Sequence, residues 1–245
     1  MSRVLIVADI HANLHALEAV LDAAGQVDEV WNLGDTVGYG PHPVEVCEQL
    51  ERLPTTVWLA GNHDLAAIGE LPLGMFNDAA AIAARWSGER IEPSWHELLR
   101  SLPTSRIEDD VTLVHGSLRD PVWEYVLSRE SAAASLEASS TAVVLVGHSH
   151  VALKAFEGPS GSVFLETAGP GVEVEFGATP TLINPGSVGQ PRDGDSRAAF
   201  AILERDTTAS RLTFSRVHYD IVGTQTAMHK VGLPRSLIER LEVGR

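Results

Sequence analysis

A single cysteine, Cys47, excludes a disulfide bond within this chain of 245 residues. Long apolar runs are also missing, because no stretch approaches the roughly 18 residues that a bilayer-spanning helix requires. The apolar run at the start, residues 4–8, is too short for a secretory signal peptide. We therefore expect a cytoplasmic protein without a membrane span, in which Cys47 is a small buried side chain on a helix.

Basic residues are scarce, since 18 Lys and Arg stand against 33 Asp and Glu and give a formal net charge of −15. A surface of this sign repels nucleic acid and anionic lipid, so we expect neither a nucleic-acid-binding surface nor a membrane partner. A small phosphate ester remains compatible with the composition, because bound divalent cations dominate the electric field around them. The composition does not indicate an oligomeric state.

The overall composition, 44% hydrophobic and 21% charged, is that of an ordinary globular protein. In the first half, short Val-rich runs alternate with segments of helical apolar spacing. The predicted strands are residues 4–8, 30–33, 57–60, 111–114 and 143–146, and the predicted helices are 13–25, 43–53, 76–90, 94–101 and 128–140. This alternation predicts a largely parallel sheet.

The second half has shorter runs separated by Gly, Pro or Asp, which is typical of antiparallel strands and hairpins. These runs are residues 151–156, 162–166, 172–176, 181–183, 198–204 and 211–217. The tail, residues 224–241, has a helical pattern that is interrupted at residues 232–234. Two stacked sheets with helices outside satisfy this order, and we expect one domain over residues 1–245 because the polar clusters described next must converge.

Five of the predicted strands end in a polar cluster. The clusters contain Asp9 with His11, Asp35, Asn62 with His63 and Asp64, His115, and His148 with His150. Ligands of open α/β sheets bind outside the carboxyl ends of the strands, so we expect one edge of one sheet to collect these side chains. A helix-capping Asp and a surface His would explain one cluster alone, but not all five in order. The pair His148 and His150 is the strongest single signal, because two buried imidazoles without a metal repel each other on protonation.

Taken in order, Asp-x-His, Gly-Asp, Gly-Asn-His-Asp, His-Gly and Gly-His-x-His resemble the calcineurin-like metallophosphoesterase superfamily. The segment 184–192, Asn-Pro-Gly-Ser-Val-Gly-Gln-Pro-Arg, is similar to one in its small prokaryotic phosphodiesterase branch. The resemblance covers the whole chain and implies a four-layer αββα sandwich, in agreement with the stacked sheets expected above. It also implies hydrolysis of phosphoric esters at a pair of metal ions.

The resemblance further implies a set of metal ligands. Asp9, His11 and His150 hold one metal, Asn62, His115 and His148 hold the other, and Asp35 bridges both. Two divalent ions, two carboxylates and a bridging hydroxide leave a net charge of about +1, which attracts a phosphate. Nitrogen and oxygen ligands without thiolate suit Mn, Fe, Zn, Co or Ni.

The implied mechanism is in-line attack on phosphorus by the hydroxide that bridges the two metals. His63 lies beside a ligand without being needed as one, so we expect it to protonate the leaving oxygen. Asp64 either orients His63 or has a structural role, and the sequence leaves both alternatives open. The expected reaction is hydrolysis of phosphodiesters or nucleotides.

One stretch departs from the protein-phosphatase branch of the superfamily, whose pattern is Gly-Asp-x-x-Asp-Arg-Gly. Gly38 stands where that pattern has an Asp that orients the histidine, and Tyr39 stands where it has an Arg that grips phosphate. We therefore rank a phosphodiesterase above a phosphomonoesterase, including a protein serine/threonine phosphatase. A non-catalytic scaffold of the same fold ranks lower, because every ligand position is present.

Other polar residues are weaker candidates. Arg119 and Arg192 carry the guanidinium fork that suits a phosphate, and His42 lies in a turn that could line the substrate mouth. A solvated surface position is the preferred interpretation of all three. Four further histidines are expected at the surface or in helix caps: His15, His96, His218 and His229. The five Trp residues are expected in the core.

Overall fold

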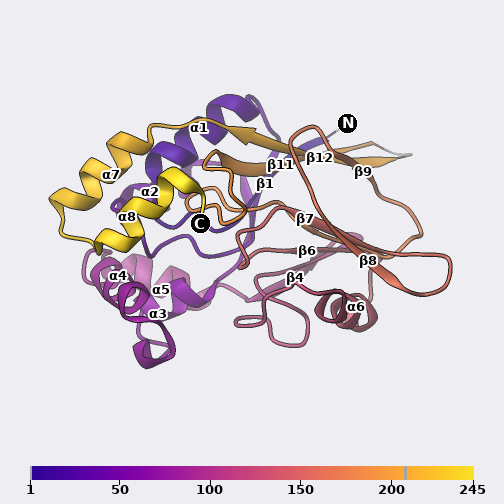
Figure 1. The fold of residues 1–245 in the computed structure, drawn as a ribbon, viewed down its shortest axis with the longest axis horizontal. Coiled ribbons are helices and arrows are strands. Elements are labelled where there is room, and N and C mark those ends of the chain that lie inside the picture. The colour runs from indigo at the N-terminus through magenta and orange to yellow at the C-terminus, as the bar shows by residue number, and fades with distance from the viewer. Residues whose placement is uncertain (1, 207–208) are drawn as a thin grey trace.

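The computed structural model describes residues 2–206 and 209–245. Two six-stranded mixed sheets pack face to face, and helices cover their outer faces (Figure 1). The predicted α/β architecture, a four-layer αββα sandwich, is confirmed. Among the described residues, no helix combines the length and the apolar character needed to cross a bilayer.

The first sheet has the order β3-β2-β1-β11-β12-β9. Its strands are β1 (Ser2–Val7), β2 (Glu29–Asn32), β3 (Thr55–Trp58), β9 (Glu173–Glu175), β11 (Ala198–Arg205) and β12 (Ser210–Val217). β1, β2 and β3 are parallel, whereas β11 pairs antiparallel with β1 and matches Ser2 with Arg205. The beginning and the later part of the chain therefore share one sheet, with β1 inside it.

The second sheet has the order β4-β5-β6-β10-β7-β8. Its strands are β4 (Ser105–Glu108), β5 (Val111–Val114), β6 (Val143–Val146), β7 (Leu153–Glu157), β8 (Val163–Thr167) and β10 (Thr181–Asn184). β5, β6 and β10 are parallel, and the outer strands are antiparallel. The predicted strands of the first half pair parallel within each sheet, as expected, and the antiparallel strands expected in the second half make both sheets mixed. β4 was not predicted, since its side chains are mostly exposed and form no apolar run.

Alternate residues of the strands fill the space between the two sheets. Val4, Ile6 and Ala8 point into this layer, while Leu5 and Val7 pack against the helices on the other face. Because β1 is covered on both faces, its sequence is a continuous apolar run. Complete burial of each of its larger side chains contributes about 1.5–3 kcal/mol relative to exposure.

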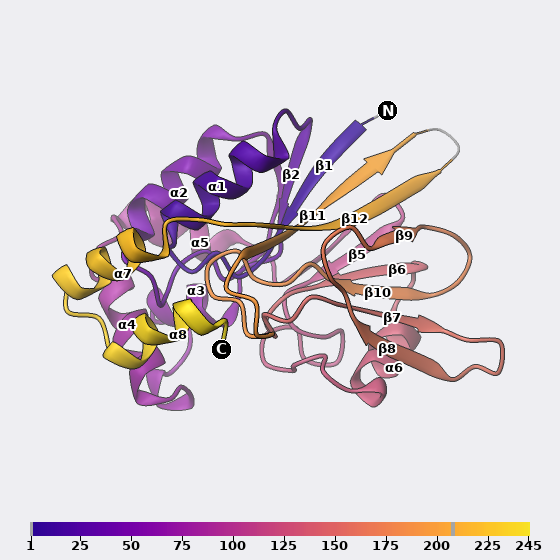
Figure 2. The same cartoon turned by 45° about the horizontal axis from the view of Figure 1, so that its top comes forward.

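The predicted helices are present as α1 (Leu14–Ala24), α2 (Pro43–Arg52), α4 (Asp78–Gly88), α5 (Pro93–Ser101), α6 (Arg129–Ala138), α7 (Ile221–Lys230) and α8 (Arg235–Val243). Asn13 caps α1 by accepting a hydrogen bond from the Ala16 N–H, and Gly25 ends this helix with a φ of 67°. Cys47 is buried on α2, as predicted. The tail forms two helices on either side of residues 232–234, and they pack beside α4 (Figure 2).

The strand ends that carry the polar clusters do not belong to one sheet, which corrects the expectation of one sheet edge. β1, β2 and β3 lie in the first sheet, and β5 and β6 lie in the second. Their carboxyl ends meet at one end of the sandwich, because the two sheets are stacked. A short helix, α3 (Asn62–Ala67), and a turn of 3-10 helix, η1 (Leu73–Met75), were not predicted.

Candidate metal centre

The polar clusters lie on loops with an unusual backbone. Left-handed conformations, with φ between 49° and 64°, occur at Asp9, His11, Asp35, His148 and His150. Such a backbone costs roughly 1–2 kcal/mol for a residue that has a Cβ atom, and strain of this kind concentrates at functional sites. The surrounding fold maintains the strain, and the sharp turns direct these side chains toward one place.

Two groups of buried side chains share Asp35. Asp9, His11, Asp35 and His150 form one group, Asp35, His115 and His148 form the other, and the ligand atoms in each group lie within 4.8 Å of one another. The Oδ2 atom of Asp35 lies 3.5 Å from His11 Nε2 and 3.5 Å from His115 Nε2. Asn62 places its Oδ1 atom 3.3 Å from His115 Nε2. The fold therefore brings the whole predicted ligand set together.

Backbone carbonyls fix the tautomers of the histidines. The Nδ1–H groups of His11, His115 and His150 donate to backbone carbonyl oxygens at 3.1, 2.9 and 2.6 Å. A carbonyl can only accept, so each Nε2 atom carries a lone pair that faces the group. His148 has the opposite orientation, since its Nε2–H donates to the Trp123 carbonyl at 3.2 Å and leaves Nδ1 as the acceptor. Metal-binding histidines are commonly held by hydrogen bonds of this kind.

Several atoms of the two groups lack a favourable hydrogen-bond partner among the described residues. Asp9 Oδ2 and Asp35 Oδ2 are buried and accept no hydrogen bond from the described residues. The Nε2 atoms of His11 and His150 face each other at 3.0 Å. Burial lowers the pKa of both rings well below the ordinary value, so two lone pairs oppose each other near pH 7. Buried carboxylates and opposed lone pairs repel unless a cation lies between them, and the donor set therefore fits divalent metal ions.

Burial also controls the protonation of the other side chains in the two groups. Desolvation raises the pKa of Asp9 well above its ordinary value, with Asp35 adding to the effect, and it raises the pKa of Asp35 to about 7. It lowers the pKa of His115 to about 4 and that of His148 to about 2. The imidazoles are thus neutral near pH 7, which is the form that binds a metal, and a bound cation would favour the charged carboxylates.

Asp64 binds the backbone of the site and does not bind His63. Its Oδ1 accepts a hydrogen bond from the Val37 N–H at 2.9 Å, and its Oδ2 accepts one from the Gly61 N–H at 3.0 Å. Burial, with the negative charge of Asp35 next, raises the pKa of Asp64 to about 7. The contact with Gly61 caps α3. The spacing Gly61-x-x-Asp64 is the local sequence signal from which this short helix could have been predicted.

His63 lies on the first turn of α3, and its ring contacts that of His11 with the centroids 4.9 Å apart. Its backbone N–H donates to Asp35 Oδ1 at 2.8 Å, and its ring packs on Tyr39 with the ring centroids 4.2 Å apart. Its Nδ1 atom is buried without a hydrogen-bond partner in the part of the chain that the structure describes. Gly38, with a φ of 86°, is so close that a Cβ atom would lie 2.8 Å from this nitrogen. The ring is thus held by packing, and Gly38 offers no side chain to orient it.

The two candidate arginines differ from each other. Arg119 is exposed and donates from Nε to Glu124 Oε2 at 3.0 Å, so the surface interpretation is confirmed for this residue. Arg192 is half-buried, and its positive charge acts on the buried carboxyl of Asp9, so the surface interpretation is wrong for it. His42 is half-buried at the start of α2 and belongs to neither ligand group.

The four histidines that were expected at the surface or in caps lie outside the ligand groups. His218 and His229 are exposed. His15 and His96 are half-buried, and each forms a hydrogen bond of 3.0 Å with a residue of a neighbouring helix. Among the Trp residues, Trp31 is completely buried in the core, as expected.

Aromatic side chains that the sequence did not indicate lie beside the ligands. Tyr125 is 45% exposed and stacks on His148 with the ring centroids 4.1 Å apart. Trp123, which was expected in the core, contacts Phe76 at 5.0 Å, and Phe76 in turn contacts His63 at 5.1 Å. Trp123 and Tyr125 lie in a loop without helix or strand, which has no periodic pattern. Only the three-dimensional contacts therefore reveal these residues.

The segment 184–192 holds the loops that carry Asp9 and His148 in place through hydrogen bonds. The Asn184 side chain donates from Nδ2 to the Gly147 carbonyl oxygen at 2.6 Å. The Ser187 hydroxyl donates to the Asp9 carbonyl oxygen at 2.8 Å. One segment therefore connects the loop after β1, in the first sheet, with the loop after β6, in the second.

Gly189 approaches the loop after β1 so closely that a Cβ atom would lie 1.9 Å from the Ile10 carbonyl oxygen. Gly189→Ala must therefore displace backbone, and we expect it to lower the free energy of unfolding by about 1–3 kcal/mol or more in urea titrations. Gly169→Ala is the control, since a Cβ there meets no atom within 4 Å. The control should change stability by less than about 0.5 kcal/mol, and equal unfolding midpoints for the two variants would contradict the bracing role.

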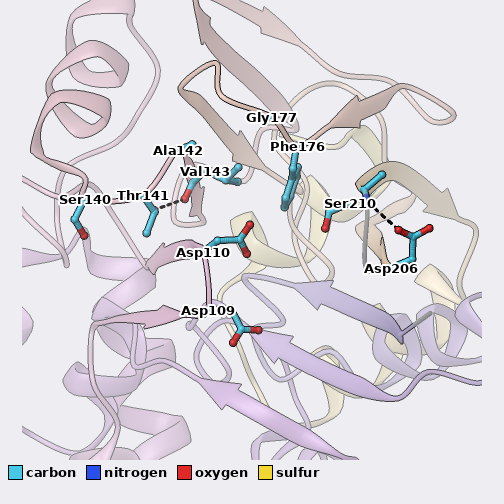
Figure 3. Close-up of a pocket in the computed structure, with 11 residues that line it drawn as sticks. Asp109, Asp110, Ser140, Thr141, Ala142, Val143, Phe176, Gly177, Asp206 and Ser210 are labelled. Atoms are coloured by element: carbon cyan, nitrogen blue, oxygen red, sulfur yellow. Dashed lines mark hydrogen bonds between the residues drawn. The ribbon is translucent and has the colours of Figure 1, made fainter.

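A cavity of about 590 Å³ opens at the opposite ends of the strands (Figure 3). Asp109 and Asp110, which line it, each accept a hydrogen bond from Arg205 at 2.8 Å. None of its described lining residues is a histidine. Val143, also in the lining, begins β6, whereas His148 follows the other end of that strand. The length of the sandwich therefore separates this cavity from the ligand groups.

The buried carboxylates and imidazoles at one end of the αββα sandwich, with the Asn62 amide beside them, form a group that can hold metal ions. The chain belongs to the calcineurin-like phosphoesterase superfamily, whose domain profile matches residues 2–208. Members of this family hydrolyse phosphoric esters and typically bind divalent metals. The family resemblance inferred from the motifs is thus confirmed.

Individual relatives agree with this membership. The chain is 43% identical to a metallophosphoesterase from Sphaerobacter thermophilus, with a TM-score of 0.90 over 100% of this chain and 99% of that one. It is 34% identical over 252 residues to an uncharacterized protein of Methanocaldococcus jannaschii, covering 100% of this chain and 99% of that protein. A shorter match, 34% identical over 122 residues, covers 46% of this chain and 41% of a symmetrical bis(5′-nucleosyl)-tetraphosphatase of Nitrosococcus oceani.

Proposed function

We propose that the chain is a dinuclear metal-dependent phosphoesterase with a single domain over residues 1–245. The observation that carries this proposal is the position of Asp35 Oδ2, which lies 3.5 Å from the Nε2 atoms of both His11 and His115. A carboxylate that belongs to two ligand groups suits a pair of ions held close together. A single ion would leave one group of buried, neutral imidazoles without a partner.

Each ligand has a place in this proposal. Asp9, His11 and His150 would hold one ion, Asn62, His115 and His148 would hold the other, and Asp35 would serve both. These nitrogen and oxygen donors suit Mn, Fe, Zn, Co or Ni. When bound, the ions supply a water activated for attack and neutralise the charge that develops on the phosphoryl oxygens. The substrate is a small phosphate ester, and the cytoplasmic location stays a prediction.

His63 is the proposed proton donor to the leaving oxygen. Burial, together with the positive charge of Arg192, lowers the pKa of His63 well below its ordinary value. The approach of a phosphate anion favours the protonated ring, and the proton passes to the leaving oxygen as its bond to phosphorus breaks. Asp64 takes the structural role, because its carboxylate already binds the backbone of Gly61 and Val37.

The proposed substrates are phosphodiesters or nucleotides, and two observations support this choice. Gly38 and Tyr39 replace the Asp and Arg of the protein-phosphatase pattern. Phe76, which packs on Trp123, places an aromatic ring beside His63, and Tyr125 places one on His148, where a nucleobase or an aryl group can stack. The partial match to a bis(5′-nucleosyl)-tetraphosphatase supports nucleotides as one group of substrates.

We expect kcat/KM for a bis-aryl phosphodiester to exceed that for the matching aryl phosphomonoester, at the same metal and pH. The diester has a second ring that can stack on Tyr125, and it carries one negative charge fewer. Because kcat/KM starts from free enzyme and substrate, the ratio compares the two transition states directly. Assays with Mn, Ni, Zn and Fe, extended to nucleotides and phosphopeptides, complete the test. A clear preference for monoesters or phosphopeptides would favour the phosphomonoesterase alternative, and no hydrolysis at all would favour a scaffold.

A further inference from the structure

Arg192 places a guanidinium group beside the two ligand groups. Its backbone N–H donates to the His150 carbonyl oxygen at 3.1 Å, so the residue is anchored next to a predicted ligand. Burial raises the pKa of Asp9 and that of Asp35, and the positive charge of Arg192 opposes the rise at both carboxyls. The guanidinium therefore acts electrostatically on both ligand groups.

This guanidinium has no ion-pair partner in the described ranges 2–206 and 209–245. Two arginines that follow it in the chain differ in this respect, since Arg197 pairs with Asp195 at 2.6 Å and Arg216 pairs with Asp193. A half-buried cation without a direct ion pair is costly, because the more distant charges of Asp9 and Asp35 replace its lost solvation only in part. An anion that enters the site would complete the pairing.

The hydrogen bonds of Arg192 also leave donors unused. Both side-chain bonds come from Nη2, which donates to Gln190 Oε1 at 3.1 Å and to Tyr39 Oη at 3.3 Å. The Nε atom is buried and has no partner among the described residues. A guanidinium carries five N–H donors in a rigid plane, and this geometry matches two oxygens of one phosphate.

Tyr39 fixes the position of the guanidinium. Besides accepting from Nη2, its ring lies 5.6 Å from the Arg192 guanidinium carbon. Tyr39 has a left-handed backbone, with a φ of 56°, and its ring also packs on His63. Met228 and Leu237 of the two C-terminal helices belong to the same apolar cluster as Tyr39. The tyrosine is therefore held from several sides, and so is the cation that it contacts.

We propose that Arg192 donates hydrogen bonds to the non-bridging oxygens of the substrate phosphate, and that Tyr39 is its positioning residue. The proposal rests on the proposed function. The guanidinium that the protein-phosphatase pattern has at position 39 is supplied here from position 192, on another loop. The phosphate then faces the Arg192 cation as well as the metals. The net charge of the site is therefore more positive than the value expected from the sequence.

The first test measures binding of inorganic phosphate to the metal-loaded protein by calorimetry, and it needs no turnover. Arg192→Gln should weaken phosphate binding by about 10- to 100-fold, as for hydrogen bonds to a charged group. Arg192→Lys should lose less, because it keeps the charge without the fork. Arg119→Gln is the matched control, since Arg119 is exposed and already paired with Glu124, and it should bind phosphate like the wild type. Metal content should be the same in all four proteins.

The second test measures hydrolysis of aryl esters by the same variants. Arg192→Gln should lower kcat/KM for the monoester dianion by about 10- to 100-fold and for the diester by less, so the ratio of diester to monoester rises. Tyr39→Phe keeps the ring and removes the hydroxyl acceptor. It should lower the monoester value by about 2- to 10-fold without loss of metal.

Unchanged phosphate affinity in Arg192→Gln would overturn the inference. A loss of affinity that merely parallels a loss of metal would also overturn it, because Arg192 would then be a structural residue. If the wild type hydrolyses no ester, the proposed function fails by itself. The calorimetry still decides the inference in that case, since phosphate binding that depends on Arg192 supports it and an absence of phosphate binding refutes it.

Discussion

Replacing His63 by glutamine is expected to slow hydrolysis of an alkyl phosphodiester by a factor on the order of 10²–10⁴. An alkoxide needs a proton as it leaves, and glutamine has no acidic proton to give. His63 contacts Asp35 only through its backbone N–H, so the metal content should stay at the wild-type value. The measurements are kcat/KM and the metal content of the same preparation.

The leaving group separates this role from the alternatives. Nitrophenolate leaves without a proton, so the loss in His63→Gln should shrink to less than about tenfold on a nitrophenyl ester. His42→Gln is the matched control, because His42 is a half-buried histidine outside both ligand groups. It should leave both rates unchanged. An equal loss on the two esters, or a loss of metal, would show that His63 is not the proton donor.

Asp35→Asn is expected to empty both metal sites, whereas His150→Ala should mainly weaken one. The Oδ2 atom of Asp35 lies at the same distance, 3.5 Å, from a histidine of each group, and an amide brings no charge to either ion. The ions supply several kcal/mol of transition-state stabilisation, so Asp35→Asn should lose a factor on the order of 10³ or more in kcat. Elemental analysis of reconstituted proteins gives the number of ions per chain.

Thermal unfolding gives an independent reading of the same site. A ligand that binds only the folded chain stabilises it by about 4 kcal/mol when present at 1,000 times its Kd. Chelation should therefore lower the Tm of the wild type, and added metal should barely raise the Tm of Asp35→Asn. One ion per wild-type chain at excess metal would contradict the dinuclear proposal and leave the family membership intact.

The positions of the buried polar side chains could be predicted because strong local signals precede them. The strands before Asp9 and His148 are buried on both faces, so each is an unbroken apolar run that ends abruptly at a polar residue. The assignment of all strand ends to one sheet failed, because strand pairing is a long-range property. No local pattern shows that β11 inserts beside β1, or that β5 and β6 belong to the opposite sheet.

The residues that were missed have roles that depend on distant contacts. Arg192 looks like a surface arginine in the sequence, and only its contact with Tyr39, far away in the chain, reveals its place beside the ligands. Tyr125 lies in an irregular loop, where no periodicity distinguishes a ring that stacks on His148 from a solvated one. The charges and hydrogen-bond partners of these residues in the fold therefore place them at the site, whereas the residue type alone does not.

The place of β1 within its sheet also determines when this sheet can be completed during synthesis. β1 is made well before its antiparallel neighbour β11, which ends at residue 205. Until β11 has left the ribosome, β1 presents an open edge that can pair with other chains. The segment that braces Asp9, residues 184–192, also emerges late. The two groups around Asp35 can therefore assemble only after residue 205 has been made, and the edge of β1 stays open until then.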